Sequence, residues 1–158
     1  MIELKMLFQF GSLCSDIHLW SKKENRFLKA IAIFDTGAHT THIDTNALIN
    51  LGYDVDNADK SSVSTIGSKN MSINNIVIDS LKLDNVELGP VLANFSDLSD
   101  INFPVILGMN IIKEFNVNLD FEKKLISMKP AFDVNCKIPI ERFNKNNSRF
   151  GMWTIQQK

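Results

Sequence analysis

The feature that most constrains this chain is a short apolar run that ends abruptly at an acidic residue. Residues 31–34 read Ile-Ala-Ile-Phe, and Asp35-Thr36-Gly37 follows directly. An apolar run of this length, rich in Ile and Phe, predicts a buried strand, and Asp-Thr-Gly predicts the turn that leaves it. A strand would hold the Asp35 carboxylate rigidly, and Gly37 has no side chain to keep a ligand from its backbone. The same residues also suit an ordinary turn in which Asp35 bonds the local backbone.

Composition favours one globular domain without a nucleic-acid or membrane partner. The 158 residues are 44% hydrophobic and 22% charged, which is enough for a buried core. The net charge of -1 gives no sign of a polyanionic partner. No apolar run approaches the roughly 20 residues that span a bilayer.

The same bulk properties predict a cytoplasmic protein without a metal site. Glu3 and Gln9 interrupt the apolar N-terminal residues, which makes a poor signal peptide. Cys14 and Cys136 are two widely separated thiols, as is typical of a reducing compartment. The three histidines lack the spacing of a zinc site.

The pattern along the chain predicts an all-β fold, a small closed domain with two short helices. We expect a helix over residues 45–51, with Asp44 as its N-cap and Gly52 as its stop. A hairpin over residues 61–75 has small polar residues at its tip, around Gly67. The expected strands cover residues 2–10, 16–20, 27–34, 41–43, 76–83, 86–95 with a bulge or break at Gly89-Pro90, 103–107, 117–121 and 125–128, and helical turns are expected over residues 110–115.

These elements group into three segments. Residues 1–26 form N-terminal strands, residues 27–130 form the central domain, and residues 131–158 form an accessory tail, partly packed and partly mobile. The central domain contains both fully apolar strands that end in a Gly-containing turn.

Three features of the central domain, in this order, resemble the retroviral-type aspartic proteases (retropepsins). They are Asp35-Thr36-Gly37-Ala38, the hairpin around Gly67, and Ile106-Leu107-Gly108. The helical turns and final hairpin that follow are similar to those of the bacterial and domesticated members. The resemblance covers about residues 27–130. It implies a closed acid-protease barrel with one lobe per chain, and an aspartic endopeptidase that acts on peptide or protein substrates and needs no metal or cofactor.

The chain carries only one such motif, and this implies a homodimer. Asp79-Ser80 is followed by Leu81, and no other aspartate begins an Asp-Thr/Ser-Gly triplet. Aspartic proteases hold a water between two carboxyl groups, which share one proton because both cannot ionise at such short range. A single-lobed chain can supply two carboxyl groups only by pairing with a copy of itself across a two-fold axis.

The resemblance also assigns roles to matching residues. Asp35 is the catalytic acid. Substrate contacts are implied for Gly37, Ala38, His39, Ile43 and the flap tip, Thr65, Ile66, Gly67 and Ser68, which would close on the substrate. Support of the site is implied for Thr36, Thr41, Ile106, Leu107, Gly108 and Asn110. The cleft neighbours Ile43, Ile66 and Ile106 predict apolar substrate side chains near the scissile bond.

Two positions depart from the retroviral pattern. His39 stands where an acid is common and Met109 where an arginine is common, so the charged pair that braces those dimers is missing as a unit. We expect other contacts, such as the termini, to hold this dimer. His18 and His42 are expected on strand surfaces. The flap tip has one glycine, which predicts slower or more selective cleavage.

Other functions fit less of the chain. Asp-x-Gly followed by threonines also resembles the first phosphate loop of sugar kinases and actin-like ATPases, but those proteins need two domains and a second Gly-rich motif. The phosphatase pattern Asp-x-Asp fails because Gly37 occupies the second acidic position. A non-catalytic, dimeric binding module with the retropepsin fold remains an open alternative.

Overall fold

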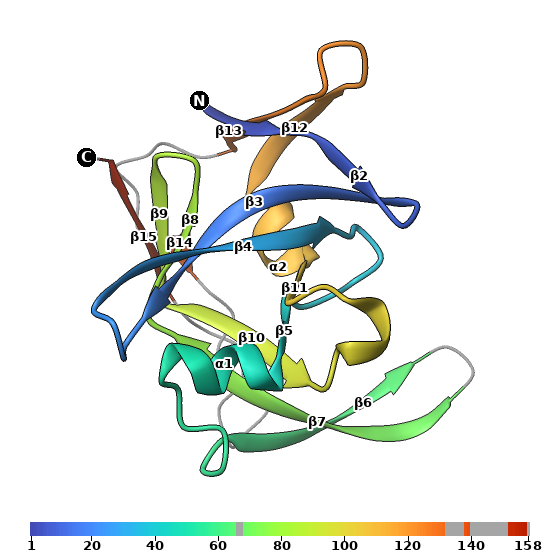
Figure 1. Ribbon diagram of the computed structural model, residues 1–158, viewed down its shortest axis with the longest axis vertical. Coiled ribbons are helices and arrows are strands. Elements are labelled where there is room, and N and C mark those ends of the chain that lie inside the picture. The colour runs from blue at the N-terminus through green and yellow to red at the C-terminus, as the bar shows by residue number, and fades with distance from the viewer. Residues whose placement is uncertain (66–67, 132–137, 140–151, 158) are drawn as a thin grey trace.

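The computed structural model describes residues 1–65, 68–131, 138–139 and 152–157 of the chain. Most of these residues lie in strands, which confirms the expected mainly β architecture (Figure 1). The strands are β1 (Ile2–Lys5), β2 (Leu7–Gln9), β3 (Ser12–Ser21), β4 (Arg26–Phe34), β5 (His42–Asp44), β6 (Asp59–Thr65), β7 (Ser68–Ile78), β8 (Leu81–Leu83), β9 (Val86–Gly89), β10 (Val91–Ser96), β11 (Val105–Leu107), β12 (Phe115–Asp120), β13 (Leu125–Pro130), β14 (Ile138–Pro139) and β15 (Met152–Gln157). The helices are α1 (Thr45–Leu51), the 3-10 helix η1 (Ser99–Ile101) and α2 (Met109–Ile112).

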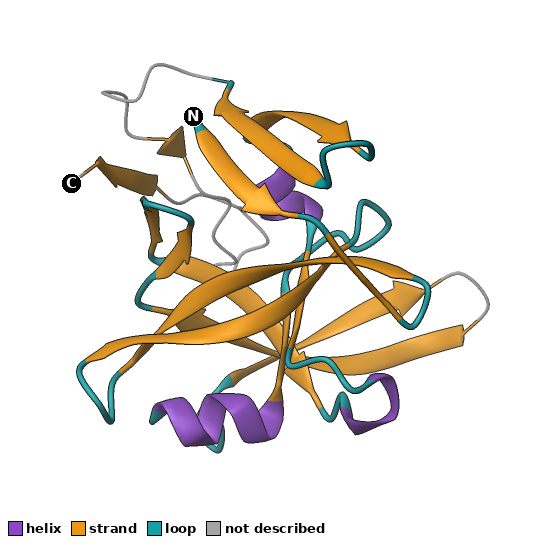
Figure 2. Ribbon diagram, turned by 45° about the horizontal axis from the view of Figure 1, so that its top comes forward, coloured by secondary structure: helices purple, strands orange, loops and turns teal. Residues whose placement is uncertain are grey.

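The strands form one long sheet and one small sheet. The long sheet has the order β14-β15-β9-β8-β3-β4-β11-β5-β10-β7-β6, and β2 pairs with β3 beside this path. It curves strongly and nearly closes into a barrel (Figures 1 and 2). The small sheet has the order β1-β13-β12. Buried side chains from both sheets, such as Ile2, Met128 and Leu107, belong to the same core.

The predicted first strand is in fact two strands that join different sheets. β1 pairs with β13, whereas β2 pairs with β3. The change occurs at Met6, whose side chain is buried and whose N–H donates to the Lys124 carbonyl at 2.8 Å. That bond extends the β1–β13 register by one residue, into the β12–β13 turn that precedes β13. Among the described residues, β1 has no further partner strand beyond this point, and from Leu7 the chain pairs with β3 instead.

At the centre of the long sheet, β11 lies between the two strands that flank the Asp35 turn. Ile106 pairs with Ile33 of β4 in parallel and with His42 of β5 in antiparallel orientation. The loop between β4 and β5 therefore passes over the carboxyl end of β11. This arrangement brings residues that are about 70 positions apart in the sequence, such as Thr41 and Asn110, into direct contact.

Helix α1 begins and ends as the sequence predicts. The Asp44 carboxylate accepts a hydrogen bond from the Ala47 N–H at 3.0 Å, and Gly52 adopts φ 87°. A side chain at Gly52 would also lie 2.9 Å from the Lys23 backbone nitrogen, so glycine is required there on two grounds. Leu48 and Leu51 attach the helix to the core.

The predicted hairpin is present as β6 and β7, which pair from Asp59–Asn75 to Thr65–Ser68. It extends from the barrel and is anchored through the pairing of β7 with β10 (Figure 2). Two predicted strands are divided further. β7 ends at Ile78 and β8 begins at Leu81, while the predicted break at Gly89-Pro90 separates β9 from β10.

Candidate active site

Asp35 is the first residue after β4, and hydrogen bonds hold it on both sides. Its N–H donates to the Leu107 carbonyl of β11 at 3.1 Å. Its Oδ1 atom accepts from the Gly37 N–H at 2.8 Å, and its carbonyl accepts from the Ala38 N–H at 3.3 Å. The half-buried carboxylate is therefore oriented by the strand below it and by its own turn.

The backbone of the loop that follows Asp35 is bonded to the start of α2. The Ala38 carbonyl accepts from the Met109 N–H at 2.7 Å, and the His39 carbonyl accepts from the Asn110 N–H at 3.1 Å. These two bonds use N–H groups that a helix start leaves without partners in the helix itself. Helix α2 thus fixes the loop and completes its own first turn.

The Asn110 side chain ties the far end of the loop to the sheet. Its Oδ1 atom accepts from the Thr41 N–H at 2.7 Å and from the Thr41 hydroxyl at 2.9 Å, and its Nδ2 donates to the Leu92 carbonyl at 2.9 Å. The Thr41 hydroxyl in turn accepts from the Gly108 N–H at 3.2 Å. Because Thr41 is fully buried, this network is shielded from water.

Gly108 allows the loop to lie directly on the end of β11. A Cβ atom at this position would lie 2.5 Å from the Thr40 carbonyl carbon and 2.7 Å from the Thr41 nitrogen. Both are backbone atoms and cannot move aside as a flexible side chain would. Any residue other than glycine would push the loop, and with it Asp35, away from the sheet.

Sheet register places Asp35, Ile106 and His42 on one face. Side chains alternate along a strand, so Asp35 leaves β4 on the same side as Ile33. Ile33 is paired with Ile106, and Ile106 with His42. His42 lies on strand β5, where it was expected, and its side chain is half-buried. Its Nε2 atom lies 2.8 Å from the Ser96 hydroxyl, and burial lowers the pKa of the His42 imidazole.

The prediction that Ile43 contacts substrate is wrong. Ile43 is fully buried in the core, opposite Val105. Thr41, just before β5, and Ile43 within it both point into the core. His42, between them, lies on the opposite face together with the half-buried Ile106. His42 is thus a neighbour of the site that was not predicted from the sequence. The alternation of side chains along an extended strand, counted from the buried Thr41, would have indicated it.

The other predicted site residues fall into two groups. Thr36, Gly37 and His39 are exposed on the loop beside Asp35, and Ala38 is half-buried there. Thr65 and Ser68 are the last paired residues at the end of the β6–β7 hairpin. Ile66 and Gly67 lie outside the described residues. The structure thus brings Asp35, Thr41, Leu107, Gly108 and Asn110 into one bonded unit.

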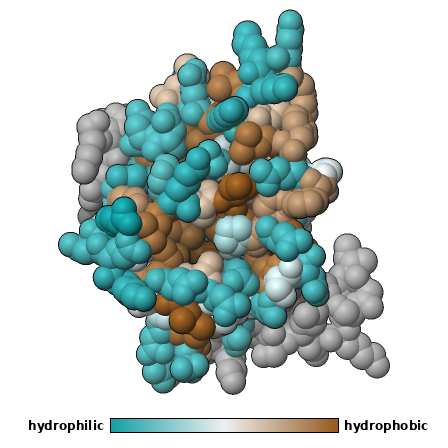
Figure 3. Space-filling view, in the orientation of Figure 1, coloured by the Kyte–Doolittle hydropathy of each residue, from teal (hydrophilic) through white to brown (hydrophobic). Residues whose placement is uncertain are grey.

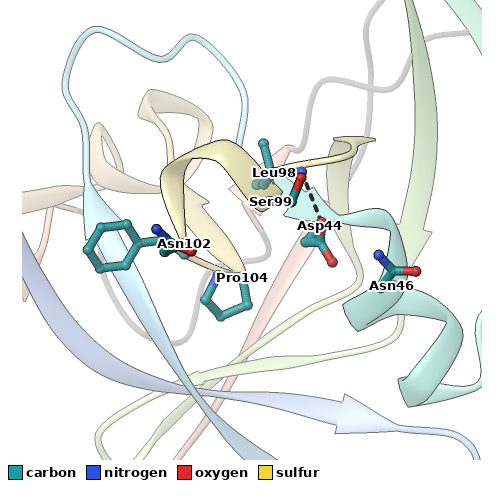
Figure 4. A pocket seen from close by; sticks show the side chains of 7 residues that line it. Asp44, Asn46, Leu98, Ser99, Asn102 and Pro104 are labelled. Atoms are coloured by element: carbon teal, nitrogen blue, oxygen red, sulfur yellow. Dashed lines mark hydrogen bonds between the residues drawn. The ribbon is translucent and has the colours of Figure 1, made fainter.

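A pocket of about 270 Å³ lies at the other ends of the same strands (Figure 4). Asp44, Asn46, Leu98, Ser99, Asn102, Phe103 and Pro104 line it. The two carboxylate oxygens of Asp44 accept hydrogen bonds from the N–H groups of Leu98 and Ala47. Asp44 therefore caps α1 and holds the η1 segment, and the pocket is separate from the bonded unit around Asp35.

Neither a metal-binding cluster nor a membrane helix is found in the described part of the chain. No three His, Cys, Asp or Glu side chains within the described ranges come together in a way that could hold a metal ion. No helix among these residues has the length and apolar character needed to cross a lipid bilayer.

Comparison with known proteins agrees with this geometry. The family model described as "Aspartyl protease" matches residues 28–111, a span that includes the Asp35 loop, the β6–β7 hairpin, Gly108 and Asn110. Among solved structures, the chain is similar to a retropepsin-like aspartic protease from Rickettsia conorii, with a TM-score of 0.56 and 19% sequence identity. The match covers 80% of this chain and 89% of that one, and shows that the two share a fold. No curated protein sequence matches the chain.

Proposed function

The chain belongs to the aspartyl protease family, and from that membership we propose that it is an endopeptidase whose active site is shared by two subunits. Each subunit of a homodimer contributes Asp35, and the two carboxyl groups activate one water. The observation that carries the proposal is the bonded unit around Asp35. The hydrogen-bond network around Thr41 and the end of the central strand β11 together position this single carboxylate. An ordinary surface turn does not need so many hydrogen bonds to hold it.

The proposed chemistry follows from two carboxyl groups that share one proton. The ionised carboxylate takes a proton from the water as its oxygen attacks the peptide carbonyl carbon, and the protonated carboxyl group donates to the carbonyl oxygen. The resulting tetrahedral diol collapses as the C–N bond breaks. The carboxyl group that took the proton from the water gives it to the nitrogen, and the other carboxylate takes the proton of a diol hydroxyl, so the pair again holds one proton.

The loop residues beside Asp35 have positions that suit the roles implied by the resemblance. The exposed Thr36 hydroxyl could bond across the two-fold axis beneath the dyad. The exposed Gly37 backbone can receive a substrate amide, and Ala38 leaves room beside it. Ile106 and His42 would form part of the wall, and the β6–β7 hairpin would close over the substrate and exclude water.

The direct test is the cleavage of an unfolded protein mixture by the wild type and by Asp35→Asn, from acidic to neutral pH. We expect peptide products from the wild type and at least a thousandfold slower cleavage by the variant, on the order of the loss seen when a catalytic group is removed. Asp84→Asn is the matched control, because Asp84 lies exposed in a turn with φ 53°, a conformation that asparagine also tolerates.

Two results would contradict the proposal. Equal cleavage by the wild type and Asp35→Asn would place the activity outside the Asp35 site. Cleavage by neither protein at any pH, with both folded, would favour the non-catalytic binding module.

A further inference from the structure

A line of exposed aromatic side chains runs along one edge of the molecule. Phe8 of β2 is 55% exposed, Phe10 in the turn after β2 is 82% exposed, and Phe121 after β12 is 61% exposed. We name these three residues the aromatic strip. The rings of Phe8 and Phe121 stack with centroids 6.1 Å apart, so the strip joins the long sheet to the small sheet. Figure 3 shows hydrophobic side chains along the right edge of the molecule, over β2 and β12.

Phe10 occupies a backbone conformation that a phenylalanine rarely adopts. The two-residue turn between β2 and β3 has φ 49° at Phe10 and φ 77° at Gly11. Turns with two positive φ angles favour Asn-Gly, because a bulky side chain is strained there. The chain thus keeps a large exposed ring where a small polar residue would relax the backbone. Within the subunit the ring makes one edge-to-face contact, with the buried Phe103 at a centroid distance of 6.0 Å, and 82% of Phe10 stays exposed. One such contact does not account for the strained turn, so the outlier points to a further role for the exposed part of the ring.

The strip ends beside the Asp35 loop. Cys14 of β3 is paired with Ile33 of β4, two residues before Asp35. The Phe10-Gly11 turn at the start of β3 therefore lies level with the carboxyl end of β4, where Figure 1 shows both loops on the same side. The described strand of the C-terminal tail, β15, pairs with β9 on the far side of the molecule.

We propose that the aromatic strip is the surface through which two copies of this chain meet, with the two Phe10 rings at the border of the joint active site. The inference rests on the proposed function, which requires two Asp35 loops to face each other across a two-fold axis. Because the Phe10-Gly11 turn lies beside the Asp35 loop, an axis that brings two Asp35 loops together also brings the Phe10-Gly11 turns of both subunits into the interface. A two-fold contact uses the same patch on both subunits, and the strip supplies such a patch.

The exposed area is sufficient for this role. A phenylalanine contributes roughly 200 Å² when buried, so the exposed fractions of the three rings amount to roughly 400 Å² per subunit. Two strips together supply roughly 800 Å², and burial of the exposed loop residues Thr36, Gly37 and His39 of both subunits would add to this, toward the approximately 1,000 Å² that a specific interface needs. Aromatic side chains are also the type enriched at the centre of such interfaces.

The test is the dissociation constant of the dimer, measured by sedimentation velocity over a wide range of protein concentration. We expect Phe10→Asn and Phe121→Ser each to raise it roughly tenfold or more, as loss of an interface anchor does. Ile49→Ser is the matched control, because Ile49 is an apolar residue on α1 that is 50% exposed and lies away from the strip. This change should leave the dissociation constant unchanged.

Phe10→Asn also separates association from folding. Asn-Gly suits this turn better than Phe-Gly, which offsets the lost ring contact with Phe103. The unfolding temperature of the isolated subunit should therefore change little while association weakens. A photo-crosslinking residue at position 121 should give a covalent dimer, whereas one at position 49 should not.

The outcomes distinguish the inference from the function on which it rests. If the wild type is a dimer and the strip variants keep its dissociation constant, the strip is not the interface, although the shared dyad can stand. If the wild type remains a monomer at every concentration, the inference is overturned, and Asp35-dependent cleavage by that monomer would overturn the shared dyad as well. A monomer that sediments with phosphatidylglycerol vesicles through Phe10 would assign the strip to a membrane instead.

Discussion

Asn110 holds the Asp35 loop with both ends of its side-chain amide. The oxygen receives two hydrogen bonds from Thr41, and the nitrogen donates to the Leu92 carbonyl of β10. Few other side chains could replace it, since an aspartate cannot donate to a carbonyl and an alanine leaves every partner unbonded. At the residue scale, the position of the Asp35 loop thus depends on a side chain that lies outside this loop.

Replacing Asn110 by alanine should therefore destabilise the protein and slow cleavage. The buried Thr41 N–H loses its partner, and we expect the free energy of unfolding to fall by about 2–3 kcal/mol. Chemical denaturation measures this loss, with Asn118→Ala on the exposed face of β12 as a control that should change stability by less than about 0.5 kcal/mol. An unchanged stability in Asn110→Ala would mean that the network does not hold the loop.

His42 should make stability depend on pH below neutrality. Burial lowers the pKa of its imidazole in the folded protein, whereas the unfolded chain binds the proton with the ordinary value near 6.5. The unfolded state thus binds more protons as the pH falls below about 6.5, and the stability present above that pH is progressively lost. Denaturation curves should show this slope in the wild type and a smaller one in His42→Gln. Equal slopes in the two proteins would contradict the account.

At the scale of elements, Tyr53 joins three segments that the sequence keeps apart. It follows α1, its hydroxyl donates to the Trp20 carbonyl of β3 at 3.1 Å, and its oxygen accepts from the Asp79 N–H just after β7 at 3.1 Å. The Lys22 ammonium group lies 4.7 Å from the centre of its ring. Tyr53 therefore fixes the base of the hairpin strand β7 against the barrel.

Tyr53→Phe should lower the free energy of unfolding by about 1–2 kcal/mol, because two partly buried hydrogen bonds to backbone groups are lost. Burial raises the pKa of Tyr53 to about 12, so the folded state retains the phenolic proton while the unfolded state loses it above about 10. The free energy of unfolding of the wild type should consequently fall between about pH 10 and 12, and this fall should be absent in Tyr53→Phe. A variant with the same alkaline loss as the wild type would refute the assignment.

The helices and strands show which structural features can be predicted from local sequence and which cannot. Helix α1 was predictable to its ends, because the Asp44 cap and the Gly52 stop are local signals. The division of residues 2–10 into β1 and β2 was not, since it depends on where pairing with the distant strand β13 stops. The same holds at the site. Asp35 and Gly108 stand out in the sequence, but the burial of Ile43 and the exposure of Phe8 and Phe121 depend on which strands become neighbours.

At the scale of the whole molecule, one chain supplies half of the proposed site. The family match and the fold place a single Asp-Thr-Gly turn at the centre of a nearly closed β barrel. The second carboxyl group would come from an identical subunit, and the aromatic strip offers the surface for that contact. Fold, catalysis and association would then depend on the same loop, since displacement of the Asp35 turn would disturb all three.

The most direct test of the shared dyad is to add a ninefold excess of Asp35→Asn to a fixed amount of wild type and follow cleavage after the subunits have exchanged. Random pairing leaves about one wild-type subunit in ten with a wild-type partner, so activity should fall about tenfold. The same excess of an unrelated folded protein should leave the rate unchanged. If Asp35→Asn also leaves it unchanged under conditions in which the subunits demonstrably mix, each chain works alone and the shared Asp35 dyad is contradicted.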